Sequence, residues 1–195
     1  MEIFQAQPND SENIAIIHYN NFKNAFLCDL GINFLILLYN WILSSNSGFG
    51  FIVKNDNKII GFVSGVYNSS GIISSFIKKN FLKAAPLLVL NCFKKPKNLK
   101  RIFETIFYPK KSDIDIKAEL LSIAVDDNYR GKGYSQELFR YFKEYLEKQD
   151  ITVFKITVDK DNVAANKFYI NRGCKLVNTY QIYCKYSNIY KCGTI

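Results

Sequence analysis

Two glycines in the second half of the chain lie between a run of apolar residues and a helical pattern. The apolar run is residues 120–125, and Gly131 and Gly133 follow it just before Ser135. Glycines at such a turn let backbone N–H groups point at an anion, and the helix after the turn adds partial positive charge. The spacing fits neither the nucleoside-triphosphate loop G-x-x-x-x-G-K-S/T nor the dinucleotide pattern G-x-G-x-x-G. It indicates a diphosphate held by main chain, or a plain helix-initiating turn.

A second group of residues with chemical potential lies one predicted strand further on. An Asn, an Ala, a Phe-Tyr pair and a Gly occur at helical spacing: Asn162, Ala165, Phe168, Tyr169 and Gly173. Together with residues 130–135, this segment resembles the GNAT superfamily of acetyl-CoA-dependent N-acetyltransferases, whose pyrophosphate loop has the form Gln/Arg-x-x-Gly-x-Gly/Ala. Ser135 and Cys174 depart from the usual residues of that family. The resemblance covers about residues 117–178.

The resemblance implies a site for acetyl-CoA, the acyl donor, and no metal. The main chain at Ile123, Ala124 and Val125 would face the pantetheine arm, because an exposed strand backbone can pair with the amides of that arm. The loop would hold the diphosphate through six residues: Arg130, Gly131, Lys132, Gly133, Tyr134 and Ser135. Asn162, Ala165 and Phe168 complete the expected site.

The same resemblance suggests two catalytic residues. Tyr169 occupies the position of the family's general acid, which protonates the departing sulfur, although a buried tyrosine packed beside Phe168 is the alternative. Glu119 lies six residues before Val125, where histone-acetylating members carry a catalytic base, and its alternative is a strand-end carboxylate in solvent. Asp126 and Asp127 are the other candidates for the base. We expect the single histidine, at position 18, to lie on a helix surface or to pack in the core.

The elements that must position these residues follow from hydrophobic spacing. The first half predicts a strand at 3–7, a helix near 11–22, a helix at 32–43 and a hairpin of strands 51–53 and 59–63. Residues 72–93 are predicted to be helical with a break near Pro86, and a one-sided helix follows at 99–107. The last third predicts strand 118–125, helix 135–148, strand 151–158, helix 163–172 and strand 175–185.

This order predicts an α/β fold with one mixed sheet and helices on both faces. The family resemblance adds that the sheet is mostly antiparallel, with a splayed parallel pair. Residues 1–195 would form one acyl-CoA N-acyltransferase domain, in which about residues 70–116 are a helical, basic insertion between strands three and four.

The chain's excess of positive charge is concentrated in that insertion. The 195 residues contain 26 Lys plus Arg and 17 Asp plus Glu, giving a net charge of +9. Ten of the basic residues lie in residues 78–111, against Glu104 alone. Such a face can be solvated, or it can meet phosphates, nucleic acid or a membrane surface. The spacing of residues 99–107 predicts that Leu99 packs inward and that Lys97, Lys100 and Arg101 face outward, where they would recruit an anionic acceptor.

Two functions of different class remain open from the sequence. The first is an enzyme that transfers an acetyl group from acetyl-CoA to a primary amine, either of a small molecule such as an amino sugar or of a peptide N-terminus. The second is a nucleic-acid-binding or membrane-surface-binding module that uses the basic insertion on an inactive scaffold. We favour the enzyme and expect no nucleic-acid partner; a homodimer is compatible with the sequence.

Cysteine usage and the apolar segments bound the remaining possibilities. Five cysteines without a C-x-x-C pair, and one histidine, predict neither a disulfide scaffold nor a zinc module. The first residues lack a basic region followed by an apolar core, so we expect a cytoplasmic protein. Residues 30–53 carry no charge, but Asn and Ser residues interrupt them, so a buried helix is expected there rather than a membrane span.

Overall fold

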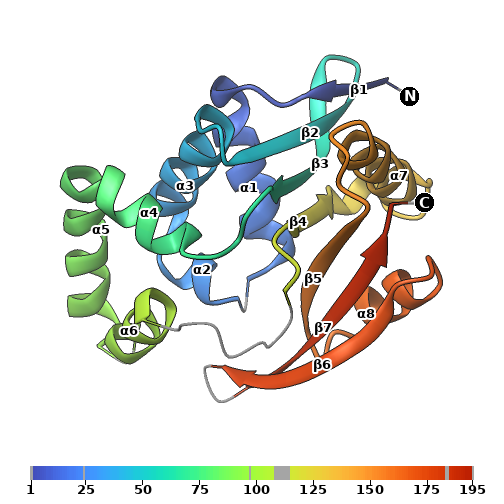
Figure 1. The fold of residues 1–195 in the computed structure, drawn as a ribbon. Helices are drawn as coiled ribbons and strands as arrows, with labels where there is room; N and C mark the ends of the chain where they lie inside the picture. Colours follow the sequence, from blue (N-terminus) through green and yellow to red (C-terminus); the bar gives the residue numbers. More distant parts are fainter. Residues whose placement is uncertain (1, 24, 97, 108–114, 183–184, 195) are drawn as a thin grey trace.

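One seven-stranded sheet, in the order β1-β2-β3-β4-β5-β7-β6, runs through the molecule (Figure 1). The computed structural model describes residues 2–23, 25–96, 98–107, 115–182 and 185–194. Only β4 and β5 pair in parallel among the strands of this sheet. The predicted mixed, mostly antiparallel sheet with one parallel pair is therefore confirmed. The strands are β1 (Glu2–Gln5), β2 (Gly48–Asn55), β3 (Lys58–Val66), β4 (Glu119–Val125), β5 (Val153–Asp159), β6 (Lys175–Ile182) and β7 (Lys185–Gly193).

Helices cover both faces of the sheet, as predicted. On one face, α1 and α3 pack over β2, β3 and β4, and on the other face α7 packs over the same strands. Helices α4, α5 and α6 lie between β3 and β4 in the chain, where the sequence predicts helices (Figure 1). The helices are α1 (Ser11–Asn21), α2 (Phe26–Asp29), α3 (Ile32–Ser44), α4 (Ile72–Lys79), α5 (Phe81–Lys94), α6 (Asn98–Phe107), α7 (Tyr134–Glu147) and α8 (Val163–Ile170), with 3-10 turns η1 (Pro8–Asp10) and η2 (Asp127–Tyr129).

Two hydrophobic clusters, one on each side of the sheet, hold these layers together. Ile14 and Leu35 belong to the cluster under α1 and α3, and Phe142 and Phe154 belong to the cluster under α7. The uncharged segment predicted as a buried helix is α3, whose Leu35 is fully buried. Among the described residues, no helix combines the length and the apolar character that crossing a membrane requires.

The β2–β3 hairpin turns where the sequence predicts. Asp56 and Asn57 sit between the strands with φ of 48° and 62°. Two consecutive residues with positive φ are typical of the turn whose twist matches that of paired strands, and Asp and Asn tolerate this conformation better than most residues. The turn fixes the register that pairs β2 with β3.

The break in the predicted helix at 72–93 lies at Asn80, so the prediction of a break near Pro86 was wrong. Asn80 has φ −115° and ψ 19°, and its N–H donates to the carbonyl of Phe76 at 2.9 Å. Its own carbonyl then accepts from Lys83 and Ala84, so one residue ends α4 and starts α5. Pro86 lies inside α5, on the exposed face of that helix.

The orientation of α6 also differs from the prediction. Leu99, expected to pack inward, is exposed, whereas Ile102 is buried as expected. Arg101, expected to face solvent, donates to Asp29 at 2.7 Å and lies over the ring of Phe26. An aromatic face and a carboxylate together bind a guanidinium better than water does, which explains this rotation. Lys100 is exposed, and Lys97 and the side chains of residues 103–107 lie outside the described part.

A disulfide joins Cys174 to Cys192, which the sequence did not predict. Lys175 of β6 pairs with Lys191 of β7, so the antiparallel register places the preceding and following cysteines opposite each other. Their Cα atoms are 4.4 Å apart, the spacing of a cross-strand pair that makes no backbone hydrogen bonds. Because no separate strand was predicted over residues 185–193, this register could not be foreseen.

Candidate active site

β4 and β5 separate soon after they begin to run side by side. Within the described sheet, their ladder contains only the pairs Glu119–Lys155 and Leu120–Ile156. β4 carries an extra residue opposite the step between Ser64 and Gly65, and a bulge of this kind bends a strand and increases its twist. Beyond Leu120, the edge of β4 is therefore free to pair with a ligand.

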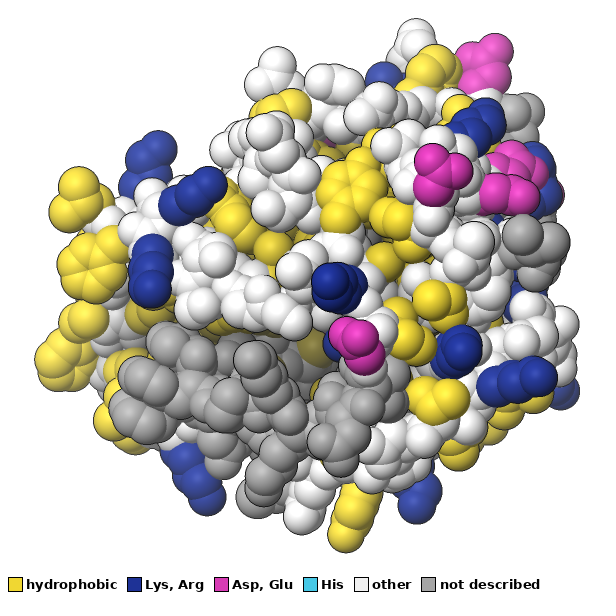
Figure 2. Space-filling view, viewed as in Figure 1, with side chains coloured by type: hydrophobic (Ala, Val, Ile, Leu, Met, Phe, Trp, Pro, Cys, Tyr) yellow, Lys and Arg dark blue, Asp and Glu magenta, His cyan; other side chains and the backbone are white. Residues whose placement is uncertain are grey.

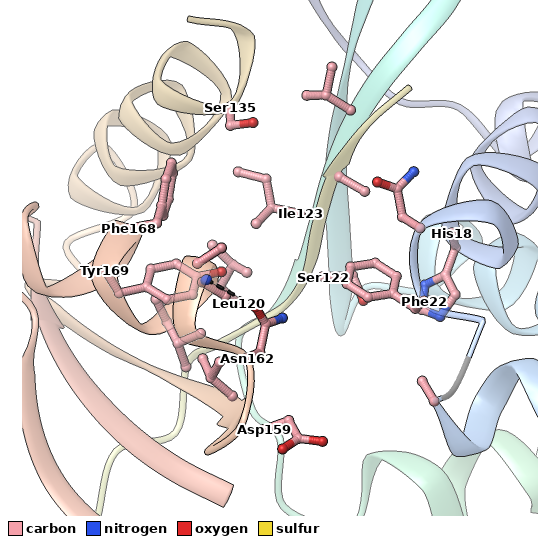
Figure 3. Close-up of a pocket in the computed structure, with 18 of the residues that line it drawn as sticks. His18, Phe22, Leu120, Ser122, Ile123, Ser135, Asp159, Asn162, Phe168 and Tyr169 are labelled. Atoms are coloured by element: carbon pink, nitrogen blue, oxygen red, sulfur yellow. Dashed lines mark hydrogen bonds between the residues drawn. The ribbon is translucent and has the colours of Figure 1, made fainter. Parts of the chain in front are cut away.

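A cleft of about 740 Å³ opens between the separated strands (Figure 3). Ile123, Ala124 and Val125 line it, as the sequence predicts for a strand that faces the pantetheine arm. β5 and α8 form a second wall, and α1 with the segment leading into α2 forms the wall opposite α8 (Figure 3). The cleft thus joins residues that lie far apart along the chain.

The glycine loop reaches one end of the cleft. Gly131 and Gly133 have φ of 77° and 85°, and Gly133 immediately precedes the first residue of α7. A Cβ atom at either position would meet nothing within 4 Å, so these glycines are required by their backbone conformation. The first N–H groups of a helix have no partner within the helix, and here they begin beside Ser135, which lines the cleft.

The structure divides the six predicted loop residues into two groups. Arg130, Gly131 and Ser135 line the cleft. Lys132, Gly133 and Tyr134 do not line it, and Lys132 places its ammonium 5.4 Å from the ring centroid of Tyr129.

Arg130 connects the loop to α1. Its guanidinium donates to the side-chain oxygen of Asn21 at 2.6 Å and lies 2.7 Å from a carboxylate oxygen of Asp127. The contact with Asn21 holds the loop to the end of α1, and the contact with Asp127 ties the guanidinium to η2. They also occupy part of the guanidinium that the sequence assigned to a phosphate.

α8 supplies the predicted aromatic and polar residues of the second motif. Asn162 caps the helix by accepting from the backbone N–H of Ala165 at 3.1 Å, which is the usual role of an asparagine at this position. Ala165, Phe168 and Tyr169 follow on the face toward the cleft.

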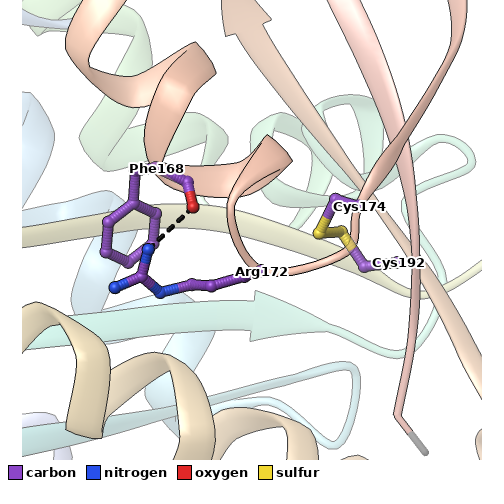
Figure 4. Close-up of a disulfide and its surroundings, with 4 residues drawn as sticks. All are labelled: Phe168, Arg172, Cys174 and Cys192. Carbon is purple, nitrogen blue, oxygen red and sulfur yellow. Dashed lines mark hydrogen bonds between the residues drawn. A yellow bond between two sulfur atoms is a disulfide. The ribbon is translucent and has the colours of Figure 1, made fainter.

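Arg172 holds Phe168 in place through two contacts. The guanidinium carbon of Arg172 lies 3.5 Å from the centroid of its ring, and Arg172 donates to the carbonyl of Phe168 at 2.8 Å (Figure 4). Figure 4 also shows the disulfide of Cys174 just beyond Arg172. The C-terminal end of α8 is therefore tied to β7 two residues after the stacked pair.

Tyr169 is buried in the wall of the cleft, with only 5% of its surface exposed. Burial raises the pKa of its hydroxyl well above the usual value, an effect that nearby Arg172 opposes. The phenol is therefore protonated at neutral pH and can act as a proton donor but not as a base. Among the described residues, none hydrogen-bonds this hydroxyl.

Glu119 does not line the cleft. Its carboxylate accepts a hydrogen bond from Thr157 at 3.0 Å and lies 3.7 Å from the ammonium of Lys155, so β5 holds it. Thr157 does line the cleft. A proton path from Glu119 to the cleft would therefore pass through the Thr157 hydroxyl.

The two alternative carboxylates lie elsewhere. Asp126 accepts from the backbone N–H of Asn128 at 3.0 Å, and Asp127 pairs with Arg130. Both line a separate groove of about 390 Å³ between η2 and α1. Their positions make them residues of the turn rather than of the cleft.

Sequence reasoning missed several lining residues, of which His18 is the clearest. His18 is buried, its Nδ1 lies 2.6 Å from the hydroxyl oxygen of Tyr39, and it lines the cleft beside Phe22 (Figure 3). Burial lowers the pKa of its imidazole to about 4, so the ring is neutral at physiological pH. The only feature of the sequence that could have marked His18 as a cleft residue is that it is the sole histidine. The spacing within α1 does not show that this helix packs over β4.

Asn166 was also overlooked, although it organises the turn from β5 to α8. Its amide nitrogen donates to the carbonyls of Asp159 at 3.0 Å and Asn162 at 2.7 Å. Its oxygen accepts from Asn188 and from the Tyr190 hydroxyl on β7. This network fixes the start of α8, and with it Asp159, the one acidic side chain among the described residues that line the cleft.

Comparison with known proteins places this arrangement in a family. Residues 103–174 match the model of the Acetyltransferase (GNAT) family, whereas no curated protein matches the chain. The fold is similar to that of an N-acetyltransferase from Staphylococcus aureus Mu50, at 20% identity and a TM-score of 0.62, over 98% of this chain and 100% of that one. It is also similar to a ribosomal-protein-alanine N-acetyltransferase from Brucella melitensis, at 14% identity and a TM-score of 0.64, over 99% of each chain.

A third similar structure is described as a complex with coenzyme A. It is the PaiA N-acetyltransferase from Thermoplasma acidophilum, at 15% identity and a TM-score of 0.60, over 99% of each chain. These likenesses show the fold across the whole chain, and the family match covers β4, the glycine loop, α7, β5 and α8, which carry most of the cleft. Residues 103–174 therefore match the GNAT acetyltransferase family, and the whole chain has the fold of the similar acetyltransferase structures.

Proposed function

We propose that this protein transfers an acetyl group from acetyl-CoA to a primary amine. The observation that carries the proposal is the free edge of β4, which leads from the glycine loop at one end of the cleft toward Tyr169. The glycine loop suits a diphosphate, the free edge of β4 suits a pantetheine arm, and the Tyr169 hydroxyl suits a leaving thiolate. The coenzyme A complex of the similar PaiA structure supports the choice of donor.

Each part of acetyl-CoA is assigned to the residues whose chemistry suits it. Backbone N–H groups at Gly131 and at the start of α7 would hold the diphosphate, assisted by the helix dipole. Ile123 and Val125 would pair through their main chain with the amides of the arm. Phe168 and Ala165 would exclude water on the opposite side.

The proposed reaction forms one C–N bond and breaks one C–S bond. The amine nitrogen attacks the thioester carbonyl carbon, and a main-chain N–H of residues 123–125 stabilises the charge on the carbonyl oxygen. The thiolate then departs and takes the proton of the Tyr169 hydroxyl, which burial keeps protonated until that step. The amine loses its proton to a base.

We propose Glu119 as the base, acting through Thr157 because Glu119 itself does not line the cleft. Its carboxylate is 3.0 Å from Thr157, and the Thr157 hydroxyl oxygen keeps a second lone pair that can accept from an amine or from a water in the cleft. In the proposed relay, the Thr157 hydroxyl oxygen takes the amine proton while Thr157 passes its own proton to the Glu119 carboxylate, so Glu119 acts through Thr157.

The acceptor would enter between β5 and the wall formed by α1 and α2. Phe22 and Leu27 give this wall an apolar surface, and Asp159 gives the facing side a carboxylate. A negative charge in the cleft attracts a protonated amine that the protein's net charge of +9 would otherwise repel. Two similar structures are described as ribosomal-protein alanine N-acetyltransferases, which supports a peptide N-terminus as one acceptor class, and amino sugars are the other.

We propose the cytoplasm as the location because acetyl-CoA is made and used there. The disulfide between Cys174 and Cys192 is unusual for that compartment, since cytoplasmic reductants keep most thiols reduced. Its state in the cell is therefore informative.

Thiol release from acetyl-CoA, measured over a panel of amines, tests the function. We expect turnover with at least one peptide N-terminus or amino sugar, and we expect coenzyme A to raise the melting temperature. Absence of thiol release with every amine, together with no stabilisation by coenzyme A, would favour a binding module on an inactive scaffold.

A further inference from the structure

Helix α5 exposes a continuous apolar stripe to solvent. Leu82, Pro86, Val89 and Phe93 recur at intervals of four, three and four residues, so they lie on one side of the helix. Leu82 and Phe93 are 87% and 84% exposed. In Figure 2, hydrophobic side chains project from the edge of the molecule where α5 lies in Figure 1. A monomeric soluble protein rarely exposes so many large apolar side chains together.

The stripe lies on the outer side of α5, and the opposite side of this helix packs on the rest of the protein. Ala84 on the opposite side of α5 is completely buried. Asn91, also inward, donates to the carbonyl of Asp29 at 2.5 Å, and Lys95 pairs with the Asp29 carboxylate at 2.7 Å. These contacts fix which side of α5 faces outward.

Lysines accompany the stripe, and acidic residues are missing from the same stretch. Lys83 and Lys94 are exposed within α5, and Lys78 and Lys79 are exposed at the end of α4. The sequence contains no Asp or Glu from residue 57 through residue 103. Figure 2 shows Lys and Arg side chains beside the projecting hydrophobic ones.

The positive charge and the apolar side chains of this face together indicate which kind of partner binds it. A second copy of the chain would bring two positive faces together, which like charges oppose. A nucleic acid would meet the lysines but would leave Leu82 and Phe93 in water. An anionic bilayer satisfies both, because apolar side chains enter the boundary between headgroups and acyl chains while lysines meet lipid phosphates.

We propose that α5 docks the protein on the surface of an anionic phospholipid bilayer. Asp29 is the last residue of α2 and hydrogen-bonds residues of both α5 and α6. α2 begins directly after Ala25, which lines the cleft. Docking would therefore bring the acceptor side of the cleft close to the bilayer. The docking itself does not depend on acetyl transfer, so the two proposals can fail separately.

Vesicle co-sedimentation tests the proposal with the full chain. We expect binding to vesicles of phosphatidylcholine with phosphatidylglycerol and much weaker binding to phosphatidylcholine alone. A Lys83→Gln, Lys94→Gln variant should bind the anionic vesicles about 30-fold more weakly, since each lysine near such a surface contributes about fivefold. A Leu82→Ser, Phe93→Ser variant should also bind more weakly. Its remaining binding depends on the lysines and should vanish as salt rises from 0.1 to 0.5 M.

A matched control uses exposed apolar residues elsewhere. Leu176 and Val177 on β6 are exposed, and Leu176→Ser with Val177→Ser should leave vesicle binding unchanged. Fluorescence of a Phe93→Trp variant adds a direct readout: its emission should shift to shorter wavelength with anionic vesicles, whereas Trp41 is buried and gives a constant background.

Three outcomes would overturn the proposal. They are equal binding of the parent and of both α5 variants, loss of binding in the β6 control, and a parent that does not sediment with anionic vesicles. Concentration-dependent dimerisation that the Leu82→Ser, Phe93→Ser variant abolishes, without vesicle binding by the parent, would assign the stripe to a second copy instead.

Discussion

The imidazole Nδ1 of His18 and the hydroxyl oxygen of Tyr39 lie 2.6 Å apart inside the helical wall of the cleft. Both side chains are buried, and burial moves the two pKa values in opposite directions, down for the imidazole and up for the phenol. Each group is therefore neutral at physiological pH. The pair joins α1 to α3 at the cleft wall that His18 lines, so its protonation state affects the stability of that wall.

The folded protein should lose stability as the pH falls below about 6.5. The pKa of His18 is lowered to about 4 in the folded state, so between these values the unfolded chain binds more protons than the folded one. This difference lowers the free energy of unfolding by about 1 kcal/mol between pH 7.5 and pH 5.5. Denaturant unfolding at the two pH values measures it.

A His18→Asn variant is the control for that experiment, because the chain has no other histidine. The variant should be less stable at both pH values, but the pH-dependent part of the difference should disappear. An equal pH dependence in parent and variant would show that His18 titrates as an exposed imidazole does.

A side chain at Gly133 should weaken coenzyme A binding. A Gly133→Val variant would force a β-branched residue to a φ of 85° directly before α7, and the resulting shift would displace the first N–H groups of that helix, which we propose hold the diphosphate. We expect at least a tenfold loss of coenzyme A affinity, roughly the strain and one lost charge-assisted hydrogen bond. Calorimetric titration measures the affinity.

Gly71 provides the matched control for Gly133. It precedes α4 with a φ of 68°, as Gly133 precedes α7, and it lies outside the cleft. A Gly71→Val variant should lose comparable stability and keep its affinity for coenzyme A. Equal affinities of the two variants would remove the loop from the proposed diphosphate site.

Replacing Tyr169 by Phe should lower turnover far more than acetyl-CoA affinity. General acid catalysis contributes about 10²–10⁴-fold, so kcat should fall by about 100-fold or more while the binding constant changes little. A Tyr145→Phe variant is the control, since its hydroxyl bonds Tyr67 at 2.6 Å, away from the cleft. If both variants retain full turnover, solvent protonates the thiolate.

Glu119→Gln and Thr157→Val should each move the rise of activity to higher pH. Either change breaks the proposed path, so the amine must lose its proton without assistance. The double variant should be no worse than the more affected single variant, because residues that act as one unit have non-additive effects. Additive losses in kcat would mean that Glu119 and Thr157 act independently.

Local patterns predicted much of this molecule. The hairpin, α3 and the strand–loop–helix around Gly131 each depend on hydrophobic spacing and turn residues that lie close together in the sequence. The loop and the second motif of α8 therefore identified many of the residues that line the cleft. Tyr169 lines the cleft and also packs in the core, with its ring centroid 5.1 Å from that of Phe168, so its catalytic role stays a prediction.

What the sequence could not predict depends on contacts between distant segments. Arg101 turns inward because Asp29, far earlier in the chain, offers a carboxylate, and no periodicity within α6 contains that information. Glu119 is held by β5, and His18 reaches the cleft because α1 packs over β4. The cleft wall formed by α1 depends on such contacts and was accordingly the part that sequence reasoning missed.

The disulfide between Cys174 and Cys192 should stabilise the C-terminal part of the sheet. The two cysteines are 18 residues apart, and closing a loop of that length restricts the unfolded chain by about 3 kcal/mol. Reducing agent should therefore lower the melting temperature of the parent by several degrees, and a Cys174→Ser variant should melt at the lower temperature with or without reductant. A Cys92→Ser variant should respond to reductant as the parent does, because Cys92 forms no disulfide. Mass spectrometry of a non-reduced digest should detect residues 174 and 192 in one cross-linked species. A parent whose melting temperature ignores reductant while that species is present would mean that the cross-link constrains a segment that is already ordered in the unfolded chain.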